Sequence, residues 1–186
     1  MKRIFAVLAA CAAVVLASGC GASDSSPKPN ASNERNPVLH ASRVKDYNSF
    51  AELKRDSVAA VSVTAVKSTV GSLNGVATTT VEVKVEKVLW GKLNEVSISV
   101  LQLGKAGWGL EDSGAILEEG QRYVLFVHPY HLKPNDDTGL YVITGGQGAY
   151  KLDGEYSEYN FAGGGHPRLP EEVSVKDFRA HILNEQ

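Results

Sequence analysis

A strict alternation of apolar and charged residues constrains the fold of this chain more than any other feature. Between positions 81 and 86 the sequence reads Val-Glu-Val-Lys-Val-Glu. Successive side chains of a β-strand point to opposite faces, so this pattern predicts a strand with one buried and one solvated face. We expect strands over residues 58–67 and 76–89, which are both rich in Val and Thr. The Asn-Gly pair in the connection, residues 71–75, favours a hairpin and leaves its turn type open.

A second run of residues identifies the expected centre of the sheet. Residues 123–127 read Tyr-Val-Leu-Phe-Val, which is too continuously apolar for a half-exposed strand. We therefore predict a central strand over residues 121–128 that is buried on both faces. The Gly-rich segment 104–120 is expected to be an ordered excursion. Further strands are expected over residues 95–103, with Val96, Ile98 and Val100 on one face, over residues 140–144 and 147–152, paired around Gly145 and Gly146, and over residues 155–161.

Capping patterns predict one helix at each end of this β region. Ser49 is followed three residues later by Glu52, and Ser174 by Asp177, as in a capping box. The expected buried positions are Phe50 and Leu53 in the first helix, and Val175, Phe178, His181 and Ile182 in the second.

The order of these elements predicts a mainly β fold. We expect five to seven mostly antiparallel strands in a small closed or half-closed barrel, with a short N-terminal helix and a C-terminal helix. A closed barrel would leave no strand edge exposed to other polypeptides.

The N-terminal residues 1–19 have the layout of an export signal. Lys2 and Arg3 precede an apolar run over residues 4–16, and three small residues follow it. As a helix this run reaches only about 20 Å, which is short for a hydrocarbon core of about 30 Å. We therefore interpret it as a targeting segment and not as a transmembrane anchor.

The residues that end this segment read Leu-Ala-Ser-Gly-Cys at positions 16–20 and resemble the lipobox of bacterial lipoproteins. In that family, signal peptidase II cuts before a cysteine whose thiol already carries a diacylglyceryl group. The resemblance implies that Cys20 is the lipidation site. It also implies a protein held on the extracytoplasmic face of the cell membrane, because two acyl groups give a stable anchor.

The mature protein is then a tether followed by one domain. Residues 20–43 are mainly polar and Pro-containing, as in a disordered linker, and residues 44–186 have the length of a single domain. Cys11 lies in the signal segment, so the domain itself contains no thiol, which excludes a disulfide framework, a cysteine nucleophile and a thiolate metal site. Removal of residues 1–19 leaves 17 basic and 21 acidic residues, a formal charge of −4, and no basic cluster for a nucleic acid.

Three segments of the domain resemble a group of uncharacterised bacterial exported proteins. They are residues 81–91, residues 119–126 (Glu-Gly-Gln-Arg-Tyr-Val-Leu-Phe) and residues 145–150 (Gly-Gly-Gln-Gly-Ala-Tyr). The domain of that group is similar to the OB-like barrel of netrin-type and metalloproteinase-inhibitor modules, so the resemblance, over residues 58–152, implies an OB-like barrel here. The inhibitors use a free N-terminal cysteine to reach a protease's zinc, whereas Cys20 would be acylated and far from the first strand. No inhibitor mechanism carries over.

Histidines offer the strongest candidate for enzyme chemistry. The sequence has His40, His128, His131, His166 and His181, and only His128 and His131 are close in sequence. Pro129 prevents a regular helix between these two, so an exposed loop pair is the favoured interpretation. The alternative is a weak metal site that His166 or Asp136 completes, with one position open for water.

Other motifs favour turns. The run Asn-Asp-Asp-Thr-Gly at positions 135–139 lacks the later Glu of a calcium loop. The Gly-rich residues 145–148 and 163–165 lack both the Gly-Lys-Ser/Thr ending of a phosphate loop and a following helix. We therefore expect no resident metal and no cofactor.

Aromatic residues provide the candidate contacts of a binding surface. Most are expected to belong to the core. The candidates for ligand contact are Trp108, in the 104–120 loop, and Tyr130 and Tyr141, which bound a second loop.

Three hypotheses for the function follow. The leading one is a non-enzymatic binding or adaptor module for a protein, peptide or glycan of the envelope. The second is a structural envelope component without a discrete ligand. The third is a metal-dependent hydrolase, which requires His128, His131 and His166 to converge.

Overall fold

The structure is a computed structural model that describes residues 38–40, 45–111, 114–154, 156–159 and 169–184. The protein divides into two units, residues 1–33 and residues 34–186, and all described residues belong to the second. The expected signal segment, Cys20 and most of the expected tether lie outside the described residues.

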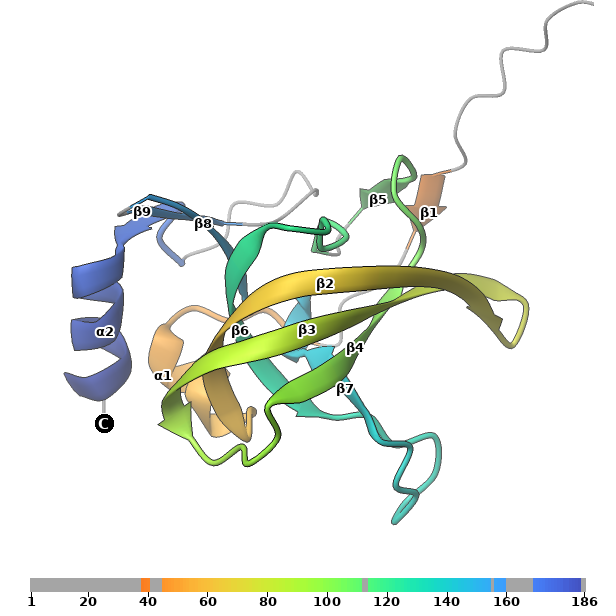
Figure 1. Cartoon of the computed structure of the whole chain (residues 1–186), viewed down its shortest axis with the longest axis horizontal. Coiled ribbons are helices and arrows are strands. Elements are labelled where there is room, and N and C mark those ends of the chain that lie inside the picture. The colour runs from red at the N-terminus through yellow and green to blue at the C-terminus, as the bar shows by residue number, and fades with distance from the viewer. Residues whose placement is uncertain (1–37, 41–44, 112–113, 155, 160–168, 185–186) are drawn as a thin grey trace, which may run out of the picture. The chain divides into compact units, whose positions relative to one another are not determined.

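Five strands form a closed ring of hydrogen bonds (Figure 1). β2 pairs with β3, β3 with β4, β4 with β7, β7 with β6, and β6 again with β2. The β4–β7 pair is parallel and the other pairs are antiparallel. The bounds are β2, Ala59–Leu73; β3, Val76–Gly91; β4, Ser97–Leu103; β6, Arg122–Pro129; and β7, Leu140–Ile143.

Three more strands continue the sheet from β6, which makes eight described strands in one sheet instead of the expected five to seven. They are β8, Ala149–Asp153, β9, Tyr156–Tyr159, and β10, Glu172–Ser174. A separate parallel pair joins β1, Val38–His40, to β5, Gly109–Glu111. The mainly β fold with two short helices is thus confirmed, and the sheet is mixed.

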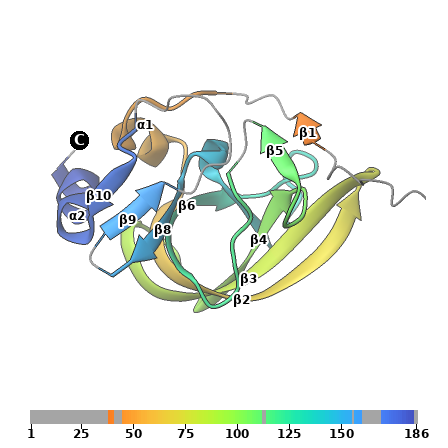
Figure 2. The same cartoon turned by 90° about the horizontal axis from the view of Figure 1, so that it is seen from above.

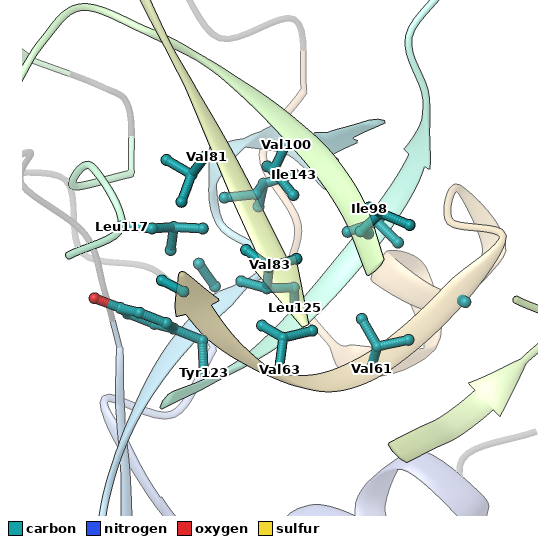
Figure 3. Packing of buried hydrophobic residues seen from close by; sticks show 14 residues of the cluster. Val61, Val63, Val81, Val83, Ile98, Val100, Leu117, Tyr123, Leu125 and Ile143 are labelled. Atoms are coloured by element: carbon teal, nitrogen blue, oxygen red, sulfur yellow. The ribbon is translucent and has the colours of Figure 1, made fainter. Parts of the chain in front are cut away.

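The inside of the ring is one hydrophobic core (Figure 3). Val61 and Val63 of β2 face Val81 and Val83 of β3, as the period-two pattern predicts. Other members come from every remaining strand of the ring and from the segment before β6: Ala59, Ala65, Ile98, Val100, Leu117, Tyr123, Leu125, Val127, Ile143 and, from β8, Ala149.

A second core covers the opposite face of the sheet, where both helices lie (Figure 2). The helices are α1, Phe50–Arg55, and α2, Val175–Asn184. The rings of Phe50, Phe126, Tyr150 and Phe178 pack against one another with centroids 4.9 to 6.2 Å apart. Other members are Tyr47, Leu53, Ala60, Val124, Leu169, Val173 and Ile182.

β6 is buried on both faces, as its continuous apolar run predicts. Tyr123, Leu125 and Val127 belong to the ring core, whereas Val124 and Phe126 belong to the second core. A strand between two cores needs apolar residues at every position, and this requirement explains the run.

The predicted N-caps are also confirmed, although the carboxylate of Glu52 accepts from the backbone N–H of Asn48, one residue before the cap. The backbone N–H of Glu52 donates to Ser49 Oγ at 3.2 Å, and that of Asp177 donates to Ser174 Oγ at 3.0 Å. Phe178 and Ile182 are buried, Val175 is half-buried, and His181 is exposed, contrary to expectation. The His181 ring contacts Phe50 at the margin of the core instead, with centroids 5.9 Å apart.

One expected core residue is on the surface. Val96 is 81% exposed and lies just before β4, which begins at Ser97 and not at the predicted residue 95. The backbone carbonyl oxygen of Val96 still accepts a hydrogen bond from Val85 N, so this residue contributes its backbone to the pairing with β3 but not its side chain to the core.

The strands expected to pair around Gly145 and Gly146 do not pair with each other. β7 and β8 both run antiparallel to β6, β7 against residues 127–129 and β8 against residues 122–125. A short 3-10 turn, Thr144–Gly146, separates them, with both glycines at positive φ. The prediction of a hairpin was wrong because this turn offsets one strand path instead of reversing it.

The expectation that no strand edge is exposed was also wrong. β2 pairs with β6 only as far as Thr64, while its hairpin with β3 continues to a two-residue turn at Asn74 and Gly75 (Figure 1). Both turn residues have positive φ, as in a type I′ turn. In addition, the short strand β1 lies within the segment predicted as tether, because its backbone pairs in parallel with that of β5, a partner about 70 residues away that the composition of the segment does not reveal.

Candidate functional site

A groove of about 740 Å³ lies on the outer face of the sheet, beside the start of α2. We call it the α2 groove. A concave pocket with an apolar floor and a few polar groups is a candidate binding site. Its described lining residues are Ser62, Glu86, Lys87, Leu89, Arg122, Val124, Leu152, Gly154, Ser174, Val175, Lys176 and Phe178.

Strand register brings the floor of the groove together. Ser62 of β2 lies between Lys87 of β3 and Val124 of β6. Farther along β6, Arg122 pairs with Leu152 of β8. The groove therefore lies where the second core gives way to polar residues on the same face of the sheet.

The floor of the groove is apolar. Val124 and Phe178 belong to the second core and are 3% and 1% exposed. Leu89 and Leu152 pack against that core and are half-buried, as is Val175 at the first turn of α2. Displacement of water from such a floor by an apolar group of a ligand lowers the free energy of the complex.

The rim of the groove is positively charged. Lys87, Arg122 and Lys176 line it and are exposed, and Glu86 is the one carboxylate among the described lining residues. Arg122 Nη2 lies 3.2 Å from Glu86 Oε2. No hydrogen bond or ion pair joins the amine of Lys87 or Lys176 to another residue that the structure describes, so both amines are available to a ligand.

Glu86 is held in its charged form. Thr64 Oγ1 donates a hydrogen bond to Glu86 Oε1 at 2.6 Å. This hydrogen bond and the neighbouring Arg122 guanidinium hold the pKa of Glu86 below its ordinary value, against the opposing effect of desolvation. The groove thus contains one carboxylate whose charge is paired with Arg122, and two amines, those of Lys87 and Lys176, without an ion-pair partner among the described residues.

The three aromatic residues predicted to contact a ligand are not brought together. Trp108 precedes β5, and Lys105 Nζ lies 5.2 Å from the centroid of its ring. Tyr130 and Tyr141 flank the β6–β7 loop, which lies on the other side of the sheet from β5 in Figure 1. Tyr141 packs at the edge of the ring core and donates to Glu95 Oε1 at 3.0 Å. Their role in binding stays a prediction.

The histidine pair has two separate sets of contacts. His131 Nδ1 lies against the backbone oxygen of Asp136, not against its carboxylate. His128 Nδ1 lies 3.2 Å from Thr144 Oγ1, which in turn lies 2.7 Å from Ser57 Oγ. Burial lowers the pKa of His128 below its ordinary value. His166, the third member of the predicted cluster, lies outside the described residues.

The hydrogen-bonded series Ser57–Thr144–His128 has the residue types of a proton relay, but its hydrogen bonds have a structural use. Ser57 Oγ donates to the backbone oxygen of Leu53 at 2.6 Å, so its proton points to the end of α1. Thr144 is fully buried. The series therefore ties α1 to the β7–β8 turn.

Metal-binding geometry is absent from the part of the protein that the structure describes, where no three His, Cys, Asp or Glu residues come together. The 135–139 segment forms turns, as predicted: Asn135 and Gly139 have positive φ, and Gly139 N donates to Asp137 Oδ1 at 3.0 Å. Residues 145–148 also form a turn, and residues 163–165 lie outside the described residues.

Comparison with protein-family models, with curated proteins and with solved structures finds no match for this sequence. No helix among the described residues is long and apolar enough to cross a membrane.

Sequence reasoning missed the α2 groove because its parts are far apart along the polypeptide. One signal was present: residues 87–89 break the alternation of β3 with Lys-Val-Leu, which places an apolar group on the outer face. The lysine of α2, by contrast, looks like any solvated helix residue.

Proposed function

We propose that the closed ring is an OB-like barrel. The strands β2, β3 and β4 are consecutive, and β6 returns through a long connection to lie beside β2, which is the strand order of a Greek key. β7 then completes the ring between β4 and β6. A five-stranded Greek-key barrel is the description of the OB fold, so this order supports the proposal.

We further propose that the protein is a non-enzymatic binding module, exported and anchored to the cell membrane through a lipid on Cys20. Its ligand is an acidic peptide segment of an envelope protein, which lies in the α2 groove. The observation that carries the proposal is the combination of an apolar floor with two unneutralised lysines at the rim.

The chemistry of the groove favours a peptide over a glycan. The leucine or valine residues of a peptide can cover the half-buried Leu89, Leu152 and Val175, whereas a sugar presents mainly hydroxyl groups that such a floor cannot satisfy. Carboxylates of the same peptide would meet Lys87 and Lys176. Structural use of the domain without a ligand, or hydrolysis by a histidine cluster, has no comparable support in the described residues.

The test measures binding of a designed peptide. The full-length protein, purified from membranes and reconstituted in lipid nanodiscs, is titrated with a fluorescein-labelled peptide of alternating leucine and glutamate. We expect saturable binding. The double variant Lys87→Glu/Lys176→Glu should weaken it on the order of tenfold, since each exposed charge pair contributes up to about 1 kcal/mol. The double variant Lys92→Glu/Lys133→Glu makes the same change in net charge away from the groove and should bind normally.

Two further titrations separate the groove from general electrostatics. A peptide of alternating leucine and lysine should not bind. Leu152→Gln, which places an amide on the floor, should weaken the acidic peptide at unchanged charge. Equal binding of both peptides would show that charge does not select the ligand, and equal loss in both double variants would show that net charge alone drives association; either outcome would refute the proposal.

A further inference from the structure

The outer part of the β2–β3 hairpin leaves one edge of the sheet open. Beyond Ala65, whose backbone amide and carbonyl bond to Gln121 and Gly120, β2 has β3 on one side and no described strand on the other. Leu73 and Val76 flank the two-residue turn and form a hydrogen-bonded pair. From this pair onwards, non-hydrogen-bonded and hydrogen-bonded pairs alternate along the two strands. The register therefore turns the backbone amide and carbonyl groups of Ser68, Val70 and Ser72 away from β3.

The inner end of this edge is already closed by a carboxylate. Ser68 N donates to Glu119 Oε1 at 2.6 Å. No hydrogen bond from another described residue reaches the outward groups of Val70 or Ser72, and both residues are exposed. Val70 and Ser72, which are two positions apart, thus present their backbone amide and carbonyl groups to solvent.

This edge lacks the devices that keep strand edges apart. Natural proteins place charges, especially Lys, or Pro on exposed edges. From Ser68 to Val81 the sequence has no charged residue and no Pro. Val70 is 61% exposed, and Val66 and Val76, elsewhere in the same hairpin, are 51% and 38% exposed. An open edge without such protection is suited to pairing with another strand.

Gly71 indicates that another backbone approaches the free edge of β2. Its φ is not in the left-handed region, and a Cβ atom at this position would meet only Thr78 Oγ1, at an ordinary 3.5 Å. The domain's own packing therefore does not require glycine. Glycine within a strand weakens it and often marks a place where another backbone approaches closely. Here the position lies midway between the free groups of Val70 and Ser72.

We propose that the free β2 edge pairs with the same edge of a second copy, antiparallel, with the twofold axis at Gly71. In this register Val70 of each copy lies opposite Ser72 of the other, and each pair exchanges two hydrogen bonds, so every free group is used. The two Gly71 residues face each other as the close, non-hydrogen-bonded pair. The two Val70 side chains lie diagonally on one face, within contact distance.

A second copy fits this edge better than an unrelated strand. The edge is complementary to itself, because its donors and acceptors are symmetric about Gly71. The absence of charge also means that no like charges meet when two copies pair. The result is a continuous sheet through both copies. This inference is independent of the α2 groove, which lies on other parts of the sheet.

Disulfide trapping in cell membranes tests the pairing with the full-length protein. In Gly71→Cys the two Cα atoms would lie about 4.5 to 5.5 Å apart, a separation that a disulfide spans. The control Val76→Cys is exposed in the same hairpin, but its mate lies three strand spacings away, about 14 Å or more, which no disulfide spans. We expect a homodimeric disulfide with Gly71→Cys that forms several-fold faster than any with Val76→Cys.

A charge at the edge provides a second test that needs no cysteine. Val70→Lys should abolish the dimer in sedimentation of the purified protein, and should also prevent trapping in the Gly71→Cys background. Val66→Lys, the same change at the bulge just outside the free edge, should leave both unchanged. Equal trapping of both cysteines, a disulfide to a different polypeptide, or loss of the dimer in Val66→Lys alone would overturn the proposal. If Gly71→Cys does not fold, the sedimentation of the two lysine variants decides.

Discussion

The aromatic ring of Tyr47 lies directly over Gly145. A Cβ atom at Gly145 would be 2.3 Å from Tyr47 Cε2, closer than any real contact. The backbone of Tyr47 is also fixed, since its N–H donates to Gln147 Oε1 at 2.8 Å. The segment before α1 thus holds the β7–β8 turn in place, and this turn lets β7 close the ring while β8 leaves it.

Substitution of Gly145 should destabilise the fold strongly. Gly145→Ala combines a steric clash with a φ of 62°, and we expect a loss of about 2–4 kcal/mol in the free energy of unfolding. Gly139→Ala is the matched control, because its φ is 66° and nothing lies within 4 Å of its Cβ. It should cost only about 1 kcal/mol. Urea unfolding of both variants measures the difference, and equal losses would show that Tyr47 contributes nothing.

The phenol of Tyr47 should titrate late. Burial, followed by the hydrogen bond that it donates to Asp56 Oδ2 at 3.0 Å, raises its pKa to about 12. A raised pKa means that the folded state favours the neutral phenol. Its contribution to stability is therefore complete below pH 10 and is lost as the pH rises from 10 to about 12.

Substitution of Asp56 tests the cause of that shift. Asp56→Asn removes the acceptor charge and should lower the pKa of Tyr47 part of the way towards its ordinary value, because burial remains. NMR titration of the labelled tyrosine ring gives the pKa in both proteins, with Tyr47→Phe to assign the signal. A pKa that is unchanged in Asp56→Asn would mean that burial alone causes the shift.

Lys54 should stabilise the contact between the two helices. Its side chain is 8% exposed, and its Nζ donates to the backbone oxygen of Ile182, in the last turn of α2, at 2.6 Å. Lys54→Met keeps the apolar stem and removes the donor, so we expect a loss of about 1–3 kcal/mol in the free energy of unfolding. Arg55→Met, an exposed neighbour in the same helix, should change it by less than about 0.5 kcal/mol. Equal effects in urea unfolding would argue against the helix contact.

Lipid attachment should depend on Cys20 alone. In cells given labelled palmitate, we expect the wild-type protein and Cys11→Ser to carry the label and to lose residues 1–19. Cys20→Ser should carry no label and keep those residues, because the modified thiol is the substrate of the cut. Labelling and the mass of the purified protein are the two measurements. Label on Cys20→Ser, or its loss in Cys11→Ser, would contradict the proposal of a lipoprotein.

Much of the local structure could be predicted because its causes are local. The caps at Ser49 and Ser174 use a hydrogen bond across three residues, and the Asn74–Gly75 turn uses two adjacent positive φ angles. The continuous apolar run of β6 predicted that its side chains are buried on both faces of the strand, as they are. These patterns are complete within a short window of the sequence.

The site could not be predicted in the same way. The α2 groove joins Lys87, Arg122 and Lys176, which no sequence pattern connects. The aromatic candidates were predicted from their positions in or beside two loops, whereas the structure gives Tyr141 a packing position at the ring core and places Trp108 next to β5.

The alternation of the strands, the N-terminal caps of both helices and the position of the central strand follow from local sequence patterns. The choice of neighbouring strands is visible only in the folded protein: β7 lies parallel to β4, β8 leaves the ring, and β2 extends beyond β6 and keeps a free edge. The physical reason is that the side-chain pattern specifies which face of a strand is buried, whereas the choice of partner depends on contacts between residues far apart in sequence. Tyr47 and Gln147, a hundred residues apart, make one such contact.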